Sequence, residues 1–291
     1  MKNQRIIFLI PYFGKWPFWM PFFIESCRHN PDIQWQFFTD CPIPVNSPDN
    51  IRYSEISFDE YNKMVSDRLG IHFNPRTPYK LCDLKPAMGY LHQDKISGYG
   101  FWGFGDIDLI YGNLRAYFSP QRLDKFDLIS THERRVSGHL CLIRNTQEML
   151  ECFKRVPQWK EKLENSEHTG FDEGAFSRLF IRYKQWPFFL RSLLSMPNRL
   201  WRHSEFYEAF STPNGRVPWH DGSFNFPDCW KWSDGKLTNS KDGDRQFPYF
   251  HFIAWKDRSE WKEHAENNFI RDAGLAQENS WKITPQGFMK D

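Results

Sequence analysis

Two aspartates, Asp106 and Asp108, directly follow a short hydrophobic stretch, Phe101–Phe104, that is typical of a buried β-strand. Carboxylates spaced two residues apart and aimed at one point repel each other unless a cation lies between them. A hard divalent ion with oxygen ligands fits this position, and such an ion would also bind a phosphate. Gly103 and Gly105 allow the backbone to bend and a ligand to approach. The alternative is a pair of surface acids at the end of a strand.

Late in the chain, a histidine and a lysine add two further groups that could bind a metal ion or a phosphate. His251 lies within an aromatic stretch, Phe247–Trp255, and Lys256 follows it five residues later. One imidazole added to two carboxylates makes a mixed nitrogen and oxygen site that suits Mn²⁺ better than Mg²⁺ or Ca²⁺. We therefore expect Mn²⁺ as the cofactor, with Mg²⁺ as the second choice. A hydrogen-bonded core histidine is the alternative interpretation of His251.

A second pair of acids, Asp172 and Glu173, stands at the start of a predicted helix, Asp172–Phe180. Acids at this place often cap a helix or stabilise its positive end. A carboxylate within hydrogen-bond reach of a reacting hydroxyl also acts as a general base. Both interpretations stay open for this pair.

The elements that must position these groups alternate between strand and helix. Helices are predicted over 18–28 and 61–69, and Pro86 is expected to kink or restart a helix that begins after Thr77. This alternation predicts an α/β fold with a mostly parallel, Rossmann-like sheet between two layers of helices. Ligands of such sheets bind beyond the carboxyl ends of the strands. The predicted strands are Ile6–Ile10, Ile33–Phe38, Ile51–Ile56, Phe101–Phe104, Phe126–Ser130 and His139–Ile143, followed by a hairpin at 229–238.

The composition is that of a folded protein and excludes some classes. Lys and Arg total 38 and Asp and Glu total 36, so the net charge of +2 argues against a nucleic-acid partner. An apolar run of about 18 residues, as a membrane span requires, is missing, and the first apolar stretch is too short for a signal peptide. The six cysteines form no Cys-x-x-Cys pattern, so we expect free thiols in a reducing cytoplasm. Aromatic residues make up 18%, which suits a packed core, a sugar- or base-binding surface or a membrane surface.

The order of strand, Asp-x-Asp pair, distant histidine and nearby lysine resembles that of metal-dependent glycosyltransferases of the GT-A fold. A closer resemblance, to bacterial glycosyltransferases associated with capsule and O-antigen polysaccharides, is carried by Tyr79–Pro86, Phe101–Asp108 and His251–Lys256. By motif order it covers roughly residues 5–256. It implies a GT-A-like domain over residues 1–256 and a C-terminal extension, 257–291, that packs on the same single domain.

The resemblance also implies roles for single residues. Asp106, Asp108 and His251 would hold the metal ion, and the two acids would also meet the ribose-diphosphate. Asp172 would be the general base, with Glu173 as its substitute. For Asp83 the alternative is an acid that stabilises a helix, and for Lys80 it is a solvated lysine. Further nucleotide contacts are implied for Lys256 at the diphosphate, for Pro11, Tyr12 and Phe13 beside the base, for Asp40 at the base, and for Asp83 and Lys80 near the ribose or phosphates.

The predicted function is therefore hexosyltransferase-like. A sugar would move from a nucleotide-diphosphate donor, expected to be a UDP-sugar, to a hydroxyl of a cell-surface glycan or lipid-linked acceptor. Two alternatives of other classes stay open. One is a non-catalytic carbohydrate-binding protein, and the other is a metal-dependent nucleotide-sugar hydrolase or nucleotidyltransferase. Whether the anomeric centre inverts or is retained also stays open.

Residues 182–202 carry five basic side chains and no acid, mixed with aromatic and aliphatic residues. Pro187 and Pro197 limit any helix in this segment to about Phe188–Met196. One interpretation is peripheral contact with anionic lipid, or with a lipid-diphosphate-linked acceptor, at the cytoplasmic face of the plasma membrane. The other interpretation is an ordinary core helix with solvated arginines.

Overall fold

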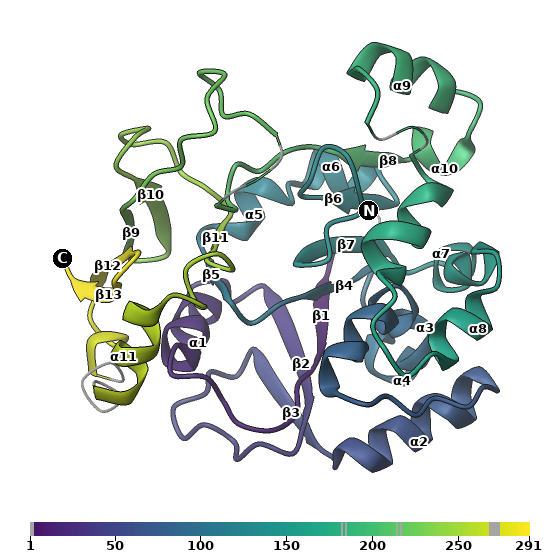
Figure 1. The fold of residues 1–291 in the computed structure, drawn as a ribbon, viewed down its shortest axis with the longest axis horizontal. Helices are drawn as coiled ribbons and strands as arrows, with labels where there is room; N and C mark the ends of the chain where they lie inside the picture. The colour runs from purple at the N-terminus through teal and green to yellow at the C-terminus, as the bar shows by residue number, and fades with distance from the viewer. Residues whose placement is uncertain (1–2, 182, 184, 214, 216, 268–273) are drawn as a thin grey trace.

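The computed structural model describes residues 3–181, 183, 185–213, 215, 217–267 and 274–291. Its centre is a seven-stranded sheet with the strand order β3-β2-β1-β4-β7-β6-β8 (Figure 1). Among the described strands of this sheet, β7 alone runs antiparallel to its neighbours. The predicted α/β fold with a mostly parallel sheet is confirmed. The strands are β1 (Ile6–Pro11), β2 (Ile33–Thr39), β3 (Ile51–Glu55), β4 (Phe101–Gly105), β6 (Leu128–Ser130), β7 (Leu140–Arg144) and β8 (Ser204–Phe206).

Each of the six strands predicted from apolar runs is present, with ends that differ by one or two residues. Continuous apolar runs work as a signal here because the central strands are buried on both faces. Gly103 in β4 is needed for this packing, since a Cβ atom at that position would come within 2.6 Å of the Phe8 ring on β1.

Helices cover both faces of the central sheet (Figure 1). The apolar side chains of α2, α3, α7 and α8 belong to the core on one face, and those of α1, α5 and α6 belong to the core on the other. The α-helices are α1 (Met20–Arg28), α2 (Phe58–Leu69), α3 (Met88–Leu91), α4 (Gln93–Ile96), α5 (Leu114–Tyr117), α6 (Pro120–Lys125), α7 (Gln147–Leu150), α8 (Trp159–Glu164), α9 (Phe188–Ser195), α10 (Arg199–Arg202) and α11 (Ser259–Asn267).

Two segments that carry predicted site residues are helical, but their winding differs from that of an α-helix. Pro78–Ala87 forms a 3₁₀ helix, η1, and α3 starts directly after it, so the restart expected at Pro86 is confirmed. The predicted helix Asp172–Phe180 is a single π-helical turn, η3 (Phe171–Ala175), followed by a 3₁₀ turn, η4 (Phe176–Leu179). A further 3₁₀ turn, η2, spans Cys152–Arg155.

A second sheet, with the order β10-β9-β12-β13, combines the predicted hairpin with the C-terminal end of the chain. Much of the aromatic excess is buried here against α1. Trp232 stacks on Trp281 at 4.8 Å between ring centroids, and Phe22 of α1 stacks on Phe288 at 3.8 Å. The division into residues 1–256 and 257–291 stays a prediction. The strands are β9 (Trp230–Ser233), β10 (Lys236–Asn239), β12 (Ser280–Thr284) and β13 (Gly287–Lys290).

Three other predictions about the chain have outcomes in the structure. All six cysteines are free thiols, as expected. Within the described residues, the helices are too short or too polar to cross a bilayer. The predicted helix near Phe188–Met196 is α9, but the alternative of an ordinary core helix is wrong because Phe188, Phe189 and Leu193 are exposed. Arg182 and Lys184 of this segment lie outside the described residues.

Candidate active site

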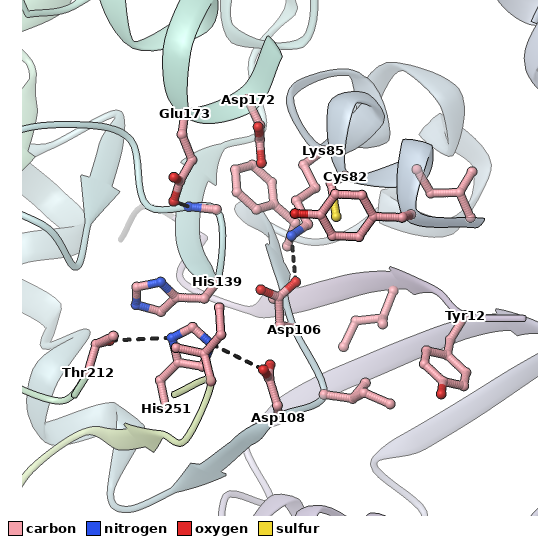
Figure 2. Close-up of a pocket in the computed structure, with 18 of the residues that line it drawn as sticks. Tyr12, Cys82, Lys85, Asp106, Asp108, His139, Asp172, Glu173, Thr212 and His251 are labelled. Carbon is pink, nitrogen blue, oxygen red and sulfur yellow. Dashed lines mark hydrogen bonds and ion pairs between the residues drawn. The ribbon is translucent and has the colours of Figure 1, made fainter. Parts of the chain in front are cut away.

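A cleft of about 1000 Å³ opens beyond the carboxyl ends of β1 and β4. Pro11, Tyr12 and Phe13 reach it from the end of β1, and Phe104–Asp108 reaches it from the end of β4. Figure 2 shows Asp106 and Asp108 in the middle of the cleft, with Tyr12 on one side and Glu173 and Thr212 on the other. The cleft therefore lies where a parallel sheet of this kind leaves space for a ligand.

Asp106, Asp108 and His251 converge in this cleft. A two-stranded sheet brings them together, because β11 (Tyr249–His251) pairs with β5 (Leu109–Tyr111) and sets His251 opposite Leu109. One ligand atom from each of the three side chains lies within 4.8 Å of the other two. The sequence pattern predicted this group, and the pairing of β5 with β11 is its structural cause.

The electrostatics of the buried Asp108 favour its ionised form. Its Oδ2 atom lies 3.3 Å from His251 Nε2 and 2.7 Å from Lys256 Nζ. Burial raises the pKa of Asp108, but His251 and Lys256 outweigh it and hold this pKa far below its ordinary value. The buried Nε2 atom of His251 has no hydrogen-bond partner of suitable geometry among the described residues. An ionised carboxylate beside an imidazole nitrogen that makes no well-aligned hydrogen bond is a donor set that fits a divalent metal ion.

The imidazole of His251 is held from behind by other polar groups. Its Nδ1 atom lies 3.4 Å from the Thr212 hydroxyl, and its ring lies against His139 with 4.4 Å between centroids. His139 bonds to the Tyr249 hydroxyl at 2.7 Å. Burial, followed by the neighbouring His251, lowers the pKa of His139 well below its ordinary value, so His139 is neutral. These contacts fix the ring plane of His251 toward Asp108, as outer partners of metal ligands do.

Lys85 is a cleft residue that the sequence analysis missed. Its Nζ atom lies 2.5 Å from Asp106 Oδ1. Burial lowers the pKa of Lys85, but Asp106 and other neighbours raise it well above its ordinary value, so this lysine is charged. The winding of η1 places Lys85 in the cleft. With three residues per turn, Tyr79, Cys82 and Lys85 share one face, and all three line the cleft.

Lys80 and Asp83, which were expected near the ribose or phosphates, occupy another face of η1 and are not among the residues that line the cleft. They form a buried ion pair, with 2.8 Å between Lys80 Nζ and Asp83 Oδ2. The Asp83 carboxylate also accepts hydrogen bonds from the backbone N–H groups of Thr169 and Phe171, both at 2.7 Å. In the structure, these two residues hold the loop that precedes Asp172.

Asp83, His168 and Asp172 form a second group that could hold a metal ion. The charge of Asp83 is already compensated, however, because Lys80 and two backbone N–H groups are directed at its carboxylate. Burial raises the pKa of Asp83, but these partners outweigh it and lower that pKa overall. This group is therefore better explained as a structural anchor than as an ion site.

Asp172 and Glu173 both line the cleft, but they have different surroundings. Asp172 is 4% exposed, and burial raises its pKa to about 6 although Lys85 acts in the opposite direction. Glu173 accepts a hydrogen bond from Gly138 N at 3.0 Å and lies 3.3 Å from Arg135. A carboxyl group with a pKa near neutrality suits proton transfer, so Asp172 fits the predicted role of general base better than Glu173, which is held by its neighbours. The π-helical turn that presents both acids is a local winding often found at functional sites.

The residues expected at a nucleobase are only partly in the cleft. Tyr12 lines it and stacks on Trp16 with 5.0 Å between centroids. Burial raises the pKa of Tyr12 to about 12, so its hydroxyl stays protonated. Asp40 is exposed and accepts a hydrogen bond from Gly14 N at 2.8 Å, but it is not among the lining residues.

Glu208 is a second cleft residue that the sequence analysis did not single out. It lies after β8, lines the cleft and comes within 4.0 Å of His132. Burial raises the pKa of Glu208 to about 7. The sequence around Glu208 carries no motif, and only the fold shows that this acid faces the same space as Glu173.

Sequence comparison gives a family for the chain but no described activity. Residues 8–291 match a family described as a family of unknown function (DUF6625), and the chain belongs to that family. No curated protein sequence matches it significantly.

Comparison of structures gives distant likenesses. The galactosyltransferase LgtC, in complex with donor and acceptor sugar analogues, is similar with 10% identity and a TM-score of 0.44, over 94% of this chain and 96% of that one. The apo form of mouse xyloside xylosyltransferase 1 is similar with 10% identity and a TM-score of 0.38, over 82% of this chain and 99% of that one. At such identities the likeness concerns the course of the chain and not the side chains of the cleft.

Proposed function

We propose that this protein is a metal-dependent glycosyltransferase that moves a sugar from a nucleotide-diphosphate donor, expected to be a UDP-sugar, to a hydroxyl of a glycan or lipid-linked acceptor. The observation that carries the proposal is the convergence of Asp106, Asp108 and His251 in the cleft, with a lysine beside each acid. Mn²⁺ is the expected ion, and Mg²⁺ is the second choice.

The charges immediately around the proposed metal site suit a diphosphate. Two aspartates and two lysines, Lys85 and Lys256, sum to zero. Addition of one divalent cation gives the site a charge of +2, which is opposite in sign to a diphosphate. When bound, the ion would stabilise the negative charge that develops on the leaving diphosphate. The two ammonium groups, which the pKa shifts keep protonated, supply fixed positive charge to the same leaving group.

The two ends of the cleft suit the two substrates. Tyr12 and its neighbours offer an aromatic wall on one side of Asp106 and Asp108, as a nucleobase requires. Asp172 and Glu173 lie on another side, where an acceptor hydroxyl would arrive. In the transfer, the acceptor oxygen forms a bond to the anomeric carbon, and the bond from that carbon to the diphosphate oxygen breaks. Asp172 takes the proton of the acceptor hydroxyl, and the nucleoside diphosphate leaves.

The test is a panel of nucleotide sugars, assayed for hydrolysis and for transfer with Mn²⁺, with Mg²⁺ and with EDTA. We expect turnover of one donor class with Mn²⁺, loss of turnover with EDTA, and stabilisation against heat by UDP only when Mn²⁺ is present. Asp108→Asn should lose both effects, whereas Asp67→Asn, a matched change at an exposed acid on α2, should keep them. Sugar binding that is independent of nucleotide and metal would contradict the proposal and favour a carbohydrate-binding protein. Release of product with water as the sole acceptor, across a panel of glycan acceptors, would favour a hydrolase.

A further inference from the structure

Helix α9 is built with its polarity reversed. Its exposed side chains are large and apolar: Phe188 is 64% exposed, Phe189 is 68% exposed and Leu193 is 62% exposed. Its buried side chains are polar, since Arg191 and Ser195 are 2% and 1% exposed. A helix on a water-facing surface normally shows the opposite arrangement, with its apolar stripe directed at the core. The outward face of α9 therefore lacks the environment that its composition requires.

The apolar surface continues on both sides of the helix. Tyr183 and Trp186 precede α9 and are exposed, with 4.8 Å between their ring centroids, and Met196 follows it and is exposed. Leu194, within the helix, is 43% exposed. We call these residues, together with Phe188, Phe189 and Leu193, the α9 surface. Tyrosine and tryptophan are the residues that concentrate at the boundary between lipid and water.

The charge of the surrounding chain has a single sign. Residues 174–204 contain no Asp or Glu. Arg178, Arg199 and Arg202 from this stretch are exposed. An exposed apolar face flanked by exposed arginines matches the interfacial region of a bilayer that contains anionic lipid, where apolar groups enter the acyl boundary and cations meet the headgroups.

The buried side of α9 connects it to the cleft. Arg191 Nη2 lies 2.6 Å from Glu133 Oε1, and Arg191 Nη1 donates to the Glu133 carbonyl oxygen at 3.3 Å. The residues on either side of Glu133 in the same loop include His132 and Arg135, which line the cleft near Glu173. Figure 1 shows α9 projecting at the periphery, away from the second sheet. The ion pair thus fixes the α9 surface to the rim of the cleft on the side of the proposed acceptor.

We propose that the α9 surface docks this protein on a bilayer that contains anionic lipid. A second copy of the chain is the less suitable occupant. A symmetric contact through this face would bring the same patch of each copy together, and with it the like charges of Arg199 and Arg202. Arg199 lies 3.7 Å from Glu148 of α7, but both side chains are exposed to solvent, where such a pair contributes little.

Docking itself does not depend on the transferase function. One consequence does rest on that proposed function: the acceptor is a glycan linked to a lipid diphosphate. Docking through α9 would hold the acceptor side of the cleft near the headgroups, where the head of such an acceptor lies. The donor, a soluble nucleotide sugar, would reach the Tyr12 side of the cleft from water.

The experiment is flotation of the full chain with vesicles of phosphatidylcholine alone and of phosphatidylcholine mixed with phosphatidylglycerol. We expect binding to the anionic vesicles that falls with added salt, and little binding to the neutral ones. Phe188→Ser combined with Leu193→Ser should reduce the bound fraction at least tenfold. Arg199→Gln combined with Arg202→Gln should reduce it several-fold and weaken its dependence on salt. Phe224→Ser, a matched control at an aromatic that is 65% exposed in another loop, should bind like the unaltered chain.

Two results would overturn the docking proposal. One is equal binding by the Phe188→Ser/Leu193→Ser variant, with circular dichroism confirming that it is folded. The other is self-association of the unaltered chain, measured by sedimentation, that disappears in the same variant while no vesicle binding occurs. That second result would assign the surface to a contact between copies.

Failure of docking and failure of the transferase proposal can be told apart. Asp108→Asn should abolish turnover of the soluble donor but still float with anionic vesicles, so the two properties are measured on different variants. A protein that floats as expected and turns over no nucleotide sugar would retain the docking proposal and lose the lipid-linked acceptor. A protein that transfers sugar equally to water-soluble and vesicle-bound acceptors would also contradict the lipid-linked acceptor.

Discussion

Charged side chains are usually exposed and large apolar side chains are usually buried. The cleft and the α9 surface depart from this rule in opposite directions. The cleft buries charge: Asp108 is 3% exposed and Asp172 is 4% exposed. The α9 surface exposes apolar rings that are more than half accessible to solvent. The buried charges of the cleft are largely compensated from within the molecule, since Lys256 pairs with Asp108 and Lys85 with Asp106. The exposed rings of the α9 surface are covered only in part by the described residues, since Arg191 lies 5.5 Å from the centre of the Phe188 ring and Tyr183 contacts Trp186.

This difference indicates which binding partner each region requires. A buried and paired set of charges is stable in the free protein and can be prepared for a ligand in advance. An exposed apolar face gains free energy only when something covers it. Variants of the cleft should therefore change chemistry more than association with lipid, whereas variants of the α9 surface should change association first.

The largest effect is expected from the proposed metal ligands. Asp108→Asn removes an ionised carboxylate from beside His251 and Lys256, and we expect sugar transfer to fall about 10⁴-fold or more. The measurement is steady-state transfer with saturating Mn²⁺, together with the thermal shift produced by UDP and Mn²⁺. A rate within about tenfold of the unaltered protein would refute the role of this side chain.

Asp172→Asn should have a smaller effect, a loss of about 10²–10³-fold in transfer, because general-base catalysis contributes less than stabilisation of the leaving group. The pH profile gives a second test. Asp172 accepts a proton only when it is ionised, and burial raises its pKa to about 6, so transfer should rise with pH through about 6 and reach a plateau above it. In Asp172→Asn this limb should be absent. Glu173→Gln is the matched variant. If it lost as much transfer activity as Asp172→Asn, and the acidic limb of the pH profile persisted in Asp172→Asn, the general base would be Glu173.

Two lysines on one 3₁₀ helix should separate chemistry from stability. Lys85→Met should reduce transfer about tenfold or more, and it should also move the acidic limb to higher pH, because Lys85 lowers the pKa of Asp172. Lys80→Met breaks a buried ion pair and should instead reduce the free energy of unfolding by about 3–5 kcal/mol. Urea denaturation and pH–rate profiles of both variants check this. Equal effects of the two variants on both properties would show that the two faces of η1 are not functionally distinct.

The smallest expected effect concerns the ion pair beneath α9. Arg191→Met should lower the free energy of unfolding by about 1–3 kcal/mol, because Glu133 keeps partial access to water when its partner is removed. Vesicle binding should fall several-fold, since the α9 surface is less firmly held. Denaturation and flotation of this variant provide the measurement. Tighter vesicle binding in Arg191→Met would show that the ion pair restrains α9 rather than presenting it.

The sequence predicted those parts of the molecule that depend on local pattern. The strands were predictable because a strand covered on both faces must be apolar throughout, as Ile6–Leu9 is. Asp106 and Asp108 followed from their place after such a strand. His251 was assigned to the same site from its donor chemistry and from the resemblance, whereas the structural cause, the pairing of β11 with β5 across more than a hundred residues, has no local signal.

The parts that were missed depend on winding and on long-range contact. Lys80 and Asp83 were expected near the nucleotide from the resemblance alone, whereas the 3₁₀ winding of η1 places Lys85 in the cleft and leaves Lys80 and Asp83 outside its lining. Arg191 was expected in solvent because a charged residue among apolar ones is usually solvated. Its partner, Glu133, is 58 residues away, and no local pattern could reveal it.

The pairing of β11 with β5 also affects when the protein becomes competent during its synthesis. The strands β1 to β4, β6, β7 and β8 all precede residue 207, so the central sheet can be completed while residues 249–251 have not yet emerged from the ribosome. Until then the nascent chain carries a folded platform and two aspartates without their imidazole. A chain that ends before Tyr249 would have all seven strands of the central sheet but neither His251 nor Lys256, so we expect it to be inactive in the proposed transfer.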